Sequence, residues 1–91
     1  MLEGEFQKQV IKTLKAKKWY VIRTQMGIKS GISDLLIMKN GRTIWLELKR
    51  PDGKGKPSLQ QIKVVNDIIN HGCEAYFVKS IEELEEIIKN H

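Results

Sequence analysis

The sequence predicts an α/β fold in which helices flank a small mixed β-sheet, with the elements in the order α-β-β-β-α-β-α. Three observations lead to this prediction: short β-branched and aromatic runs bounded by turn residues, an Asn-Gly pair between two of these runs, and two serine capping boxes before helical patterns. A single domain over residues 1–91 is expected, because 91 residues are too few for two independent cores.

The N-terminal part of the chain is expected to form a helix, a strand and a loop. Apolar residues recur at every fourth position from Leu2 to Leu14, and this spacing predicts an amphipathic helix over residues 3–18. The aromatic and β-branched segment 19–24 follows as a strand. Glycine and serine residues then predict a loop over 25–33.

The middle of the chain is expected to form a β-hairpin. The segments 34–39 and 42–50 are rich in apolar residues and are joined by Asn40-Gly41. This dipeptide favours a two-residue type I′ turn, since both positions of that turn need positive φ. Together with the preceding strand, the hairpin makes an antiparallel meander.

A second helix is expected after the hairpin. Pro51 stops the strand before it, and a basic loop is predicted over 52–57. Ser58 and Gln61 have the spacing of a capping box, which opens a helix. Gly72 ends that helix at the position where glycine is usual.

The C-terminal part of the chain is expected to form a strand and a third helix. Residues 74–78 are predicted to be the strand, and Ser80 with Glu83 forms a second capping box. The helix that precedes this strand allows a right-handed crossover, so the fourth strand can run parallel to the third. The sheet is therefore predicted to be mixed.

Charge and composition narrow the classes of function. Lysine and arginine number 16 against 11 acidic residues, and segment 80–91 carries a net charge of −3, so the rest of the chain is strongly basic. Such a balance favours a polyanion partner, although basic charges also simply solvate a surface. The single cysteine, Cys73, argues against a disulfide framework and a cysteine-based zinc site. An intracellular, cytoplasmic protein with no membrane segment and no organic cofactor is expected.

One end of the hairpin gathers three charged residues. If Asn40-Gly41 is the turn, Asp34 lies opposite Glu47, and Lys49 shares their face because side chains alternate along a strand. Like charges opposite one another destabilise a sheet, and a divalent cation between them would remove the conflict. Oxygen ligands at this spacing suit Mg²⁺ or Mn²⁺, and the implied reaction is metal-assisted hydrolysis of a phosphodiester.

Each half of this constellation also has an ordinary structural explanation. An aspartate at the start of a strand is usually a turn or cap residue, and Glu-x-Lys on a strand is usually a solvated salt bridge. Their opposition across an Asn-Gly turn in a basic domain favours the catalytic interpretation. A β-bulge that shifted the register by one residue would place the acids on different faces.

The segment Gly31-Ile32-Ser33-Asp34, followed one hairpin later by Glu47-Leu48-Lys49, resembles the motif of the PD-(D/E)xK nucleases. More narrowly, the chain resembles a stand-alone VRR-NUC domain of the compact kind found in viruses and bacteria. The resemblance runs from Glu5 to about Leu84 and implies a restriction-endonuclease-like fold. Two positions depart from the family pattern: Ser33 replaces a proline, and Val64 replaces an aromatic residue.

The resemblance implies a role for particular residues. Asp34 and Glu47 would be metal ligands, with the Leu48 carbonyl as a third oxygen, and Lys49 would position the attacking water or stabilise the transition state. Glu5 matches an acidic residue that supports the metal, and Gln61 matches a glutamine near the site, although a capping box explains it equally well. The candidates for contact with DNA are Arg23, Lys29, Ser33, Lys54 and Lys56, and Trp19 and Trp45 are interpreted as core residues.

The function expected from these observations is a Mg²⁺- or Mn²⁺-dependent DNA endonuclease. The resemblance implies a branched substrate such as a Holliday junction, cut by a homodimer, either in a bacterium or inside the host cell of a virus. One alternative is a non-catalytic nucleic-acid-binding module on the same fold. Another is a protein-interaction domain that uses the acidic final helix.

Overall fold

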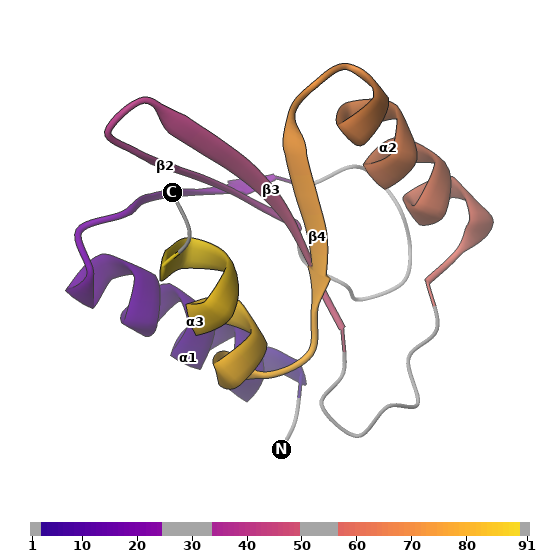
Figure 1. Ribbon diagram of the computed structural model, residues 1–91. Coiled ribbons are helices and arrows are strands. Elements are labelled where there is room, and N and C mark those ends of the chain that lie inside the picture. Colours follow the sequence, from indigo (N-terminus) through magenta and orange to yellow (C-terminus); the bar gives the residue numbers. More distant parts are fainter. Residues whose placement is uncertain (1–2, 25–33, 50–56, 90–91) are drawn as a thin grey trace.

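The computed structural model describes residues 3–24, 34–49 and 57–89, which form the predicted α-β-β-β-α-β-α order (Figure 1). The helices are α1 (Glu3–Ala16), α2 (Leu59–Asn70) and α3 (Ile81–Lys89), and the strands are β1 (Tyr20–Thr24), β2 (Asp34–Lys39), β3 (Arg42–Leu48) and β4 (Glu74–Val78). The strands form one sheet in the order β1-β2-β3-β4. The pair β3-β4 is parallel and the other two pairs are antiparallel. The small mixed α/β fold predicted from the sequence is confirmed.

The β2-β3 hairpin has the turn and the register that the sequence predicts. Asn40 and Gly41 adopt φ values of 52° and 83°, and the left-handed region that they occupy is the one a two-residue type I′ turn requires. Lys39 pairs with Arg42 beside the turn, and the ladder continues to Asp34 opposite Glu47. The hairpin therefore contains no bulge that would separate the two acidic residues.

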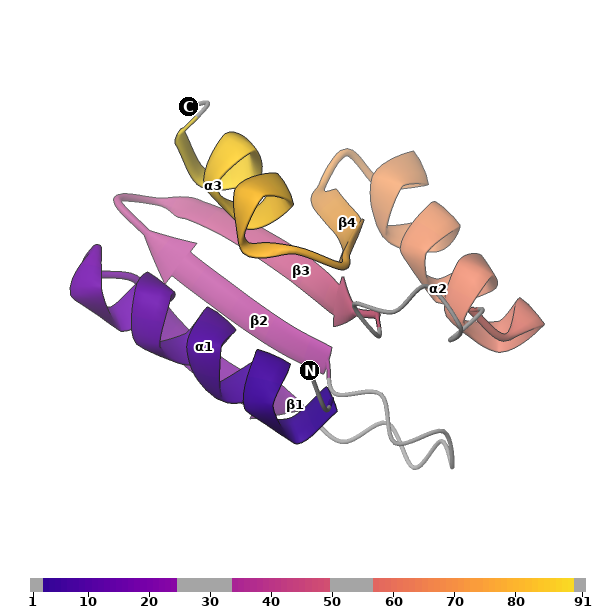
Figure 2. The ribbon, with the colours of Figure 1, turned by 90° about the horizontal axis from the view of Figure 1, so that it is seen from below.

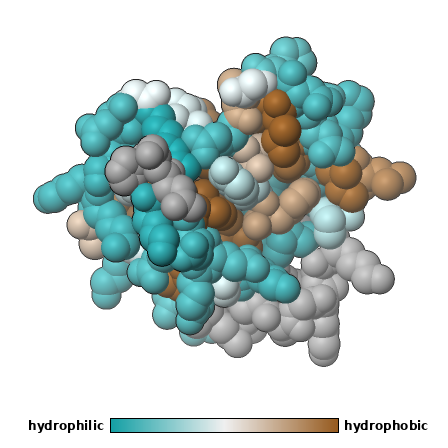
Figure 3. Space-filling model, in the orientation of Figure 1, coloured by the Kyte–Doolittle hydropathy of each residue, from teal (hydrophilic) through white to brown (hydrophobic). Residues whose placement is uncertain are grey.

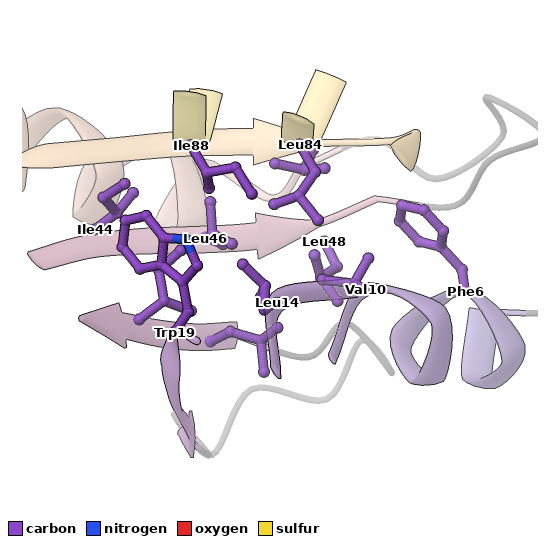
Figure 4. Packing of buried hydrophobic residues seen from close by; sticks show 12 residues of the cluster. Phe6, Val10, Leu14, Trp19, Ile44, Leu46, Leu48, Leu84 and Ile88 are labelled. Atoms are coloured by element: carbon purple, nitrogen blue, oxygen red, sulfur yellow. The ribbon is translucent and has the colours of Figure 1, made fainter. Parts of the chain in front are cut away.

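The helices cover the two faces of the sheet unequally. Helices α1 and α3 lie side by side over one face, and α2 packs on the other side of the sheet beside β4 (Figures 1 and 2). The hydrophobic core fills the space under α1 and α3, as Figure 4 shows. Its buried side chains are Phe6, Val10, Leu14, Trp19, Leu35, Ile37, Ile44, Leu46, Leu48, Val78, Leu84 and Ile88.

Alternation along β3 separates the core from the opposite face of the sheet. Ile44, Leu46 and Leu48 are at most 1% exposed and point into the core. The intervening residues of β3, Trp45 and Glu47 among them, therefore belong to the face on which α2 packs. This seven-residue strand carries both the core and the candidate site.

Helix α1 ends two residues earlier than the sequence predicts. Lys18 adopts a φ of 71°, and its N–H donates to the Lys15 carbonyl at 3.0 Å. The Trp19 N–H donates back to the Leu14 carbonyl at 3.0 Å, which completes a Schellman cap without a glycine. Because Trp19 belongs to this cap, β1 begins at Tyr20 and not at Trp19.

The two predicted serine caps behave differently. Ser58 and Gln61 form the complete capping box of α2, and Gly72, with a φ of 84°, follows the end of that helix as predicted. At α3, Ser80 Oγ accepts from the Glu83 N–H at 3.1 Å, but the Glu83 carboxylate accepts from the Lys79 N–H instead of that of Ser80. Only half of the second capping box is therefore present.

Strand β3 ends at Leu48, earlier than the predicted boundary at residue 50. The backbone N–H of Lys49 still donates to the Val78 carbonyl at 2.8 Å, so the main-chain pairing with β4 continues for one further residue. The predicted loop over 25–33 lies outside the described residues, and so do residues 52–56 of the loop predicted over 52–57. Within the described part of the chain, no helix is both long and apolar enough to cross a bilayer.

Candidate functional site

Four residues form a row across the sheet on the face away from the hydrophobic core. Thr24 pairs with Asp34, Asp34 pairs with Glu47, and Glu47 pairs with Phe77. Residues that lie opposite one another in register share a face of the sheet. The backbone therefore brings positions 34 and 47 together on neighbouring strands, as the sequence predicts.

The Glu47 carboxylate is buried within this row. Glu47 is 1% exposed, and its Oε1 accepts a hydrogen bond of 3.0 Å from the indole Nε1 of Trp45. Removing a carboxylate from water is costly unless hydrogen bonds or positive charge compensate. Glu47 therefore places a carboxylate, held by at least one hydrogen bond, within this face of the sheet.

Lys49 brings a positive charge to the same face. It is 7% exposed, and its Nζ lies over the ring of Phe77, 6.0 Å from the ring centroid. Phe77 is the partner of Glu47 in the β3-β4 ladder. The ammonium therefore lies on the side of the sheet that carries Glu47, as the spacing of Glu-x-Lys predicts.

Gln61, a residue of α2, is buried on the side of the sheet that carries Glu47. Its side chain is 2% exposed, and its Oε1 accepts from the Ser58 N–H at 2.9 Å as part of the capping box. Val65, one turn later, is the other buried residue of α2. The capping role of Gln61 is established by these contacts, and the amide nitrogen adds a donor that a capping box does not use.

Leu48 is the last residue of β3, at the end of the sheet where β2 begins, and Glu5 belongs to the helix α1 that passes this end. Glu5 is exposed in the first turn of α1, and Figure 2 shows that this end of α1 lies beside that end of the sheet. The Leu48 side chain lies in the core near Val10 (Figure 4), so only the main-chain carbonyl of Leu48 is suited to a role in the site.

The predicted DNA contacts are divided between the described and undescribed parts of the chain. Arg23 is exposed on the edge strand β1, where it pairs with the core residue Leu35. It therefore belongs to the face of the sheet that α1 and α3 cover, opposite to that of Glu47. The other candidates, Lys29, Ser33, Lys54 and Lys56, lie outside the described residues.

The described basic charge is concentrated on α1 and not around Glu47. The exposed lysines of α1 and its C-terminal turn are Lys8, Lys12, Lys15, Lys17 and Lys18. Helix α3, which packs beside α1, carries four glutamates. The two outer helices thus present opposite charges on the layer remote from the candidate site.

Two residues of this face were not selected from the sequence. Trp45, interpreted there as a core residue, is half-buried on the Glu47 face and donates to its carboxylate. Thr24 lies next to Asp34 in the row, and its Oγ1 is buried with no hydrogen-bond partner among the described residues. The alternation of side chains along a strand is enough to place Trp45 on the face of Glu47. Finding Thr24 requires the register between β1 and β2, which the sequence does not give.

A second charged cluster lies at the opposite end of β3, on the core side of the sheet. Arg42 Nε and Nη2 donate to the two carboxylate oxygens of Glu74, each at 2.7 Å, and Nη2 also donates to the Ile87 carbonyl at 3.0 Å. The Tyr76 hydroxyl donates to Glu74 Oε1 at 3.0 Å. The hydrogen bond from Arg42 holds the pKa of Glu74 below its ordinary value and raises the pKa of Arg42. Burial raises the pKa of Tyr76.

The donor chemistry of the Glu47 row fits a hard divalent cation. Among the described residues, no three histidine, cysteine, aspartate or glutamate side chains gather into a metal-binding group. The candidate centre therefore rests on the buried Glu47 carboxylate, the register position of Asp34 and the main-chain carbonyl of Leu48. Carboxylate and carbonyl oxygens are the ligands that Mg²⁺ and Mn²⁺ prefer.

Comparison of the chain with protein-family models, with curated proteins and with solved structures finds no match in any of the three.

Proposed function

We propose that this chain is a Mg²⁺- or Mn²⁺-dependent deoxyribonuclease that hydrolyses phosphodiester bonds. The observation that carries the proposal is the pairing of Asp34 with Glu47 across β2 and β3, with Glu47 and Lys49 both buried on one face. Two acids and a lysine at this spacing are the parts that metal-assisted phosphodiester hydrolysis requires. The resemblance of residues 31–34 and 47–49 to the PD-(D/E)xK motif supports the same reaction.

Each residue of the candidate site has a distinct role in this proposal. Asp34, Glu47 and the Leu48 carbonyl would hold the cation, with Glu5 in support. When bound, the cation would polarise the phosphate and acidify a water molecule. The Lys49 ammonium stabilises the negative charge that grows on the phosphate, or orients the attacking water. Gln61 would lie near the site on the α2 side, as the resemblance implies.

The proposed substrate is branched DNA, such as a four-way junction, in the cytoplasm of a cell. This part of the proposal rests on the resemblance to compact VRR-NUC domains and on the basic composition. Lys29 and Lys54 are each five residues from a site residue in the chain, which favours phosphate contacts beside the site. The exposed lysines of α1 lie on the layer remote from the site, so they would add only long-range, sequence-independent attraction for DNA.

A homodimer is the proposed working form. The chain exposes large apolar side chains: Leu59 at 86%, Tyr20 at 65% and Ile69 at 49%. Figure 3 shows apolar surface gathered on and beside α2, and a second copy would shield such a surface from water. A two-fold dimer would place two sites across a symmetric junction. Sedimentation equilibrium would measure the oligomeric state directly.

A cleavage assay on four-way junction, flap and linear duplex DNA tests the proposed function. We expect cleavage of the junction with Mg²⁺ or Mn²⁺ and none with EDTA. Asp34→Ala and Lys49→Ala should each abolish cleavage while retaining the binding of DNA. Lys63→Ala is the matched control, because it removes an exposed lysine of α2 whose partner is Asp67.

The same experiment distinguishes the alternative functions. A non-catalytic binding module would bind the junction without cutting it under any metal condition, and Asp34→Ala would change nothing. A protein-interaction domain would show little affinity for DNA and no steep loss of it between low and moderate salt. Either result would overturn the nuclease proposal.

A further inference from the structure

Trp45 is joined to the candidate metal ligand by a direct hydrogen bond. The indole Nε1 donates to Glu47 Oε1 at 3.0 Å, and the two residues lie two positions apart on β3, on the same face of the sheet. Trp45 is half-buried, whereas Glu47 is 1% exposed. The hydrogen bond therefore lies on the face of the sheet that carries the candidate site, with its acceptor end buried.

The chemistry of this contact suits the support of a ligand better than ligation itself. An indole nitrogen is a donor only, so it cannot take the place of an oxygen ligand. Its bond to one carboxylate oxygen restrains the terminal torsion of the glutamate side chain, which is otherwise broad. Hydrogen bonds to ionised acceptors are also stronger than those between neutral groups. The bond from Trp45 therefore favours one orientation of the Glu47 carboxylate.

The other tryptophan of the chain provides an internal contrast. Trp19 is 7% exposed and belongs to the core under α1 and α3, on the opposite face of the sheet. A tryptophan that only filled space would be expected in such an apolar setting. Trp45 instead directs its polar atom at a buried acid, and this placement separates its role from that of Trp19.

We propose that Trp45 is a positioning residue that fixes the Glu47 carboxylate for the divalent cation. This inference rests on the proposed metal-dependent function of the same site. Residues that orient a metal ligand through a hydrogen bond typically change metal affinity or activity by about 10- to 100-fold when they are removed. Because the glutamate is oriented in advance, less conformational freedom is lost when the cation binds.

The test is calorimetric titration of Mn²⁺ into the full chain without DNA. Trp45→Phe removes the indole donor and keeps an aromatic ring. We expect its dissociation constant for Mn²⁺ to rise about tenfold or more relative to the parent chain. Trp19→Phe is the matched control and should stay within twofold of the parent. Thermal unfolding of both variants, followed by circular dichroism, verifies that they fold.

Cleavage at different Mn²⁺ concentrations provides a readout that a purely structural role would not change, and fluorescence reports whether Mn²⁺ binds near Trp45. With Trp45→Phe, raising the Mn²⁺ concentration should restore most of the cleavage rate, since the defect is in binding the ion. In the Trp19→Phe chain, Trp45 is the remaining indole, and its fluorescence should change on addition of Mn²⁺. Glu47→Gln in that background should abolish the fluorescence change.

The outcomes separate this inference from the proposed function. If the parent binds Mn²⁺ and Trp45→Phe binds it with the same affinity as Trp19→Phe, the positioning role is wrong and the metal-dependent function stands. If neither the parent nor Glu47→Gln binds Mn²⁺ and the parent cleaves no DNA, the proposed function fails and the positioning role fails with it.

Discussion

Strand β3 carries a charged cluster near each of its ends, and the two clusters differ in how their charges are accommodated. At the start of the strand, Arg42 and Glu74 form a bidentate ion pair whose side chains keep 16% and 33% of their exposure. At its end, Glu47 and Lys49 are 1% and 7% exposed; Glu47 accepts a hydrogen bond from the Trp45 indole, and the Lys49 ammonium lies over the Phe77 ring. The ion pair at the start of the strand is partly exposed, whereas the charged groups at its end are almost fully buried.

The Arg42–Glu74 pair has a structural explanation, whereas Glu47 and Lys49 belong to the proposed metal site. The Arg42–Glu74 pair joins β3 to β4 and, through the Ile87 carbonyl, ties α3 to the sheet. Its geometry explains its presence without any reaction. Glu47 and Lys49 are more deeply buried, and their charges therefore incur a larger desolvation cost. Different consequences are therefore expected when each cluster is altered.

The largest effect is expected at Glu47. Glu47→Gln keeps the shape of the side chain and removes its charge, so it should lower junction cleavage by more than about 100-fold, because loss of a ligand exceeds loss of its support. The free energy of unfolding should change less than cleavage does, because the glutamine keeps the volume of the side chain and an oxygen that can accept from the Trp45 indole. Cleavage rates and urea unfolding at neutral pH measure the two effects. A large loss of stability with unchanged cleavage would show that Glu47 is structural.

The opposite pattern is expected for Glu74. Glu74→Gln leaves the Arg42 guanidinium without its ionic partner, and the free energy of unfolding should fall by about 1–2 kcal/mol. Cleavage by the folded variant should stay within about twofold. Asp67→Asn is the matched control, because its ion pair with Lys63 is exposed on α2 and contributes about 0.5 kcal/mol at most. Equal urea midpoints for the two variants would contradict the structural role of the Arg42 pair.

The contribution of the Glu74 pair should also depend on pH. The hydrogen bond from Arg42 lowers the pKa of Glu74 in the folded chain. Its stabilisation is therefore fully present above the pKa of the unfolded glutamate and is lost as the pH falls through the lower folded value. The difference in free energy of unfolding between the parent and Glu74→Gln should be largest at pH 7 and should shrink as the pH is lowered below the ordinary pKa of a glutamate. A constant difference over this range would exclude the ion pair as its source.

Much of the fold followed from local signals in the sequence. Asn40-Gly41 was identified as the turn because both of its residues tolerate the positive φ that a type I′ turn requires. Counting along the two strands from that turn then predicted that Asp34 pairs with Glu47. Alternation then placed Lys49 with Glu47 without further information. These features depend on contacts close in the chain, and this explains why the sequence was sufficient to predict them.

Other features depended on information that local patterns do not contain. The end of α1 was misplaced because Lys18, and not a glycine, adopts the left-handed conformation of the cap. The Arg42–Glu74 pair required the parallel register of β3 with β4, in which Ile44 lies opposite Glu74. A helical crossover fixes the direction of the second strand but not its register.

The short turn at Asn40-Gly41 also limits which sequence changes the hairpin can accept during evolution. Each arm of the hairpin has apolar residues on one side and candidate catalytic residues on the other, so one residue inserted between the turn and Glu47 would exchange the two sides beyond it. Substitutions that keep the spacing meet no such barrier. Descendants of such a hairpin can therefore lose most of their sequence identity while the count of residues between the acids stays fixed.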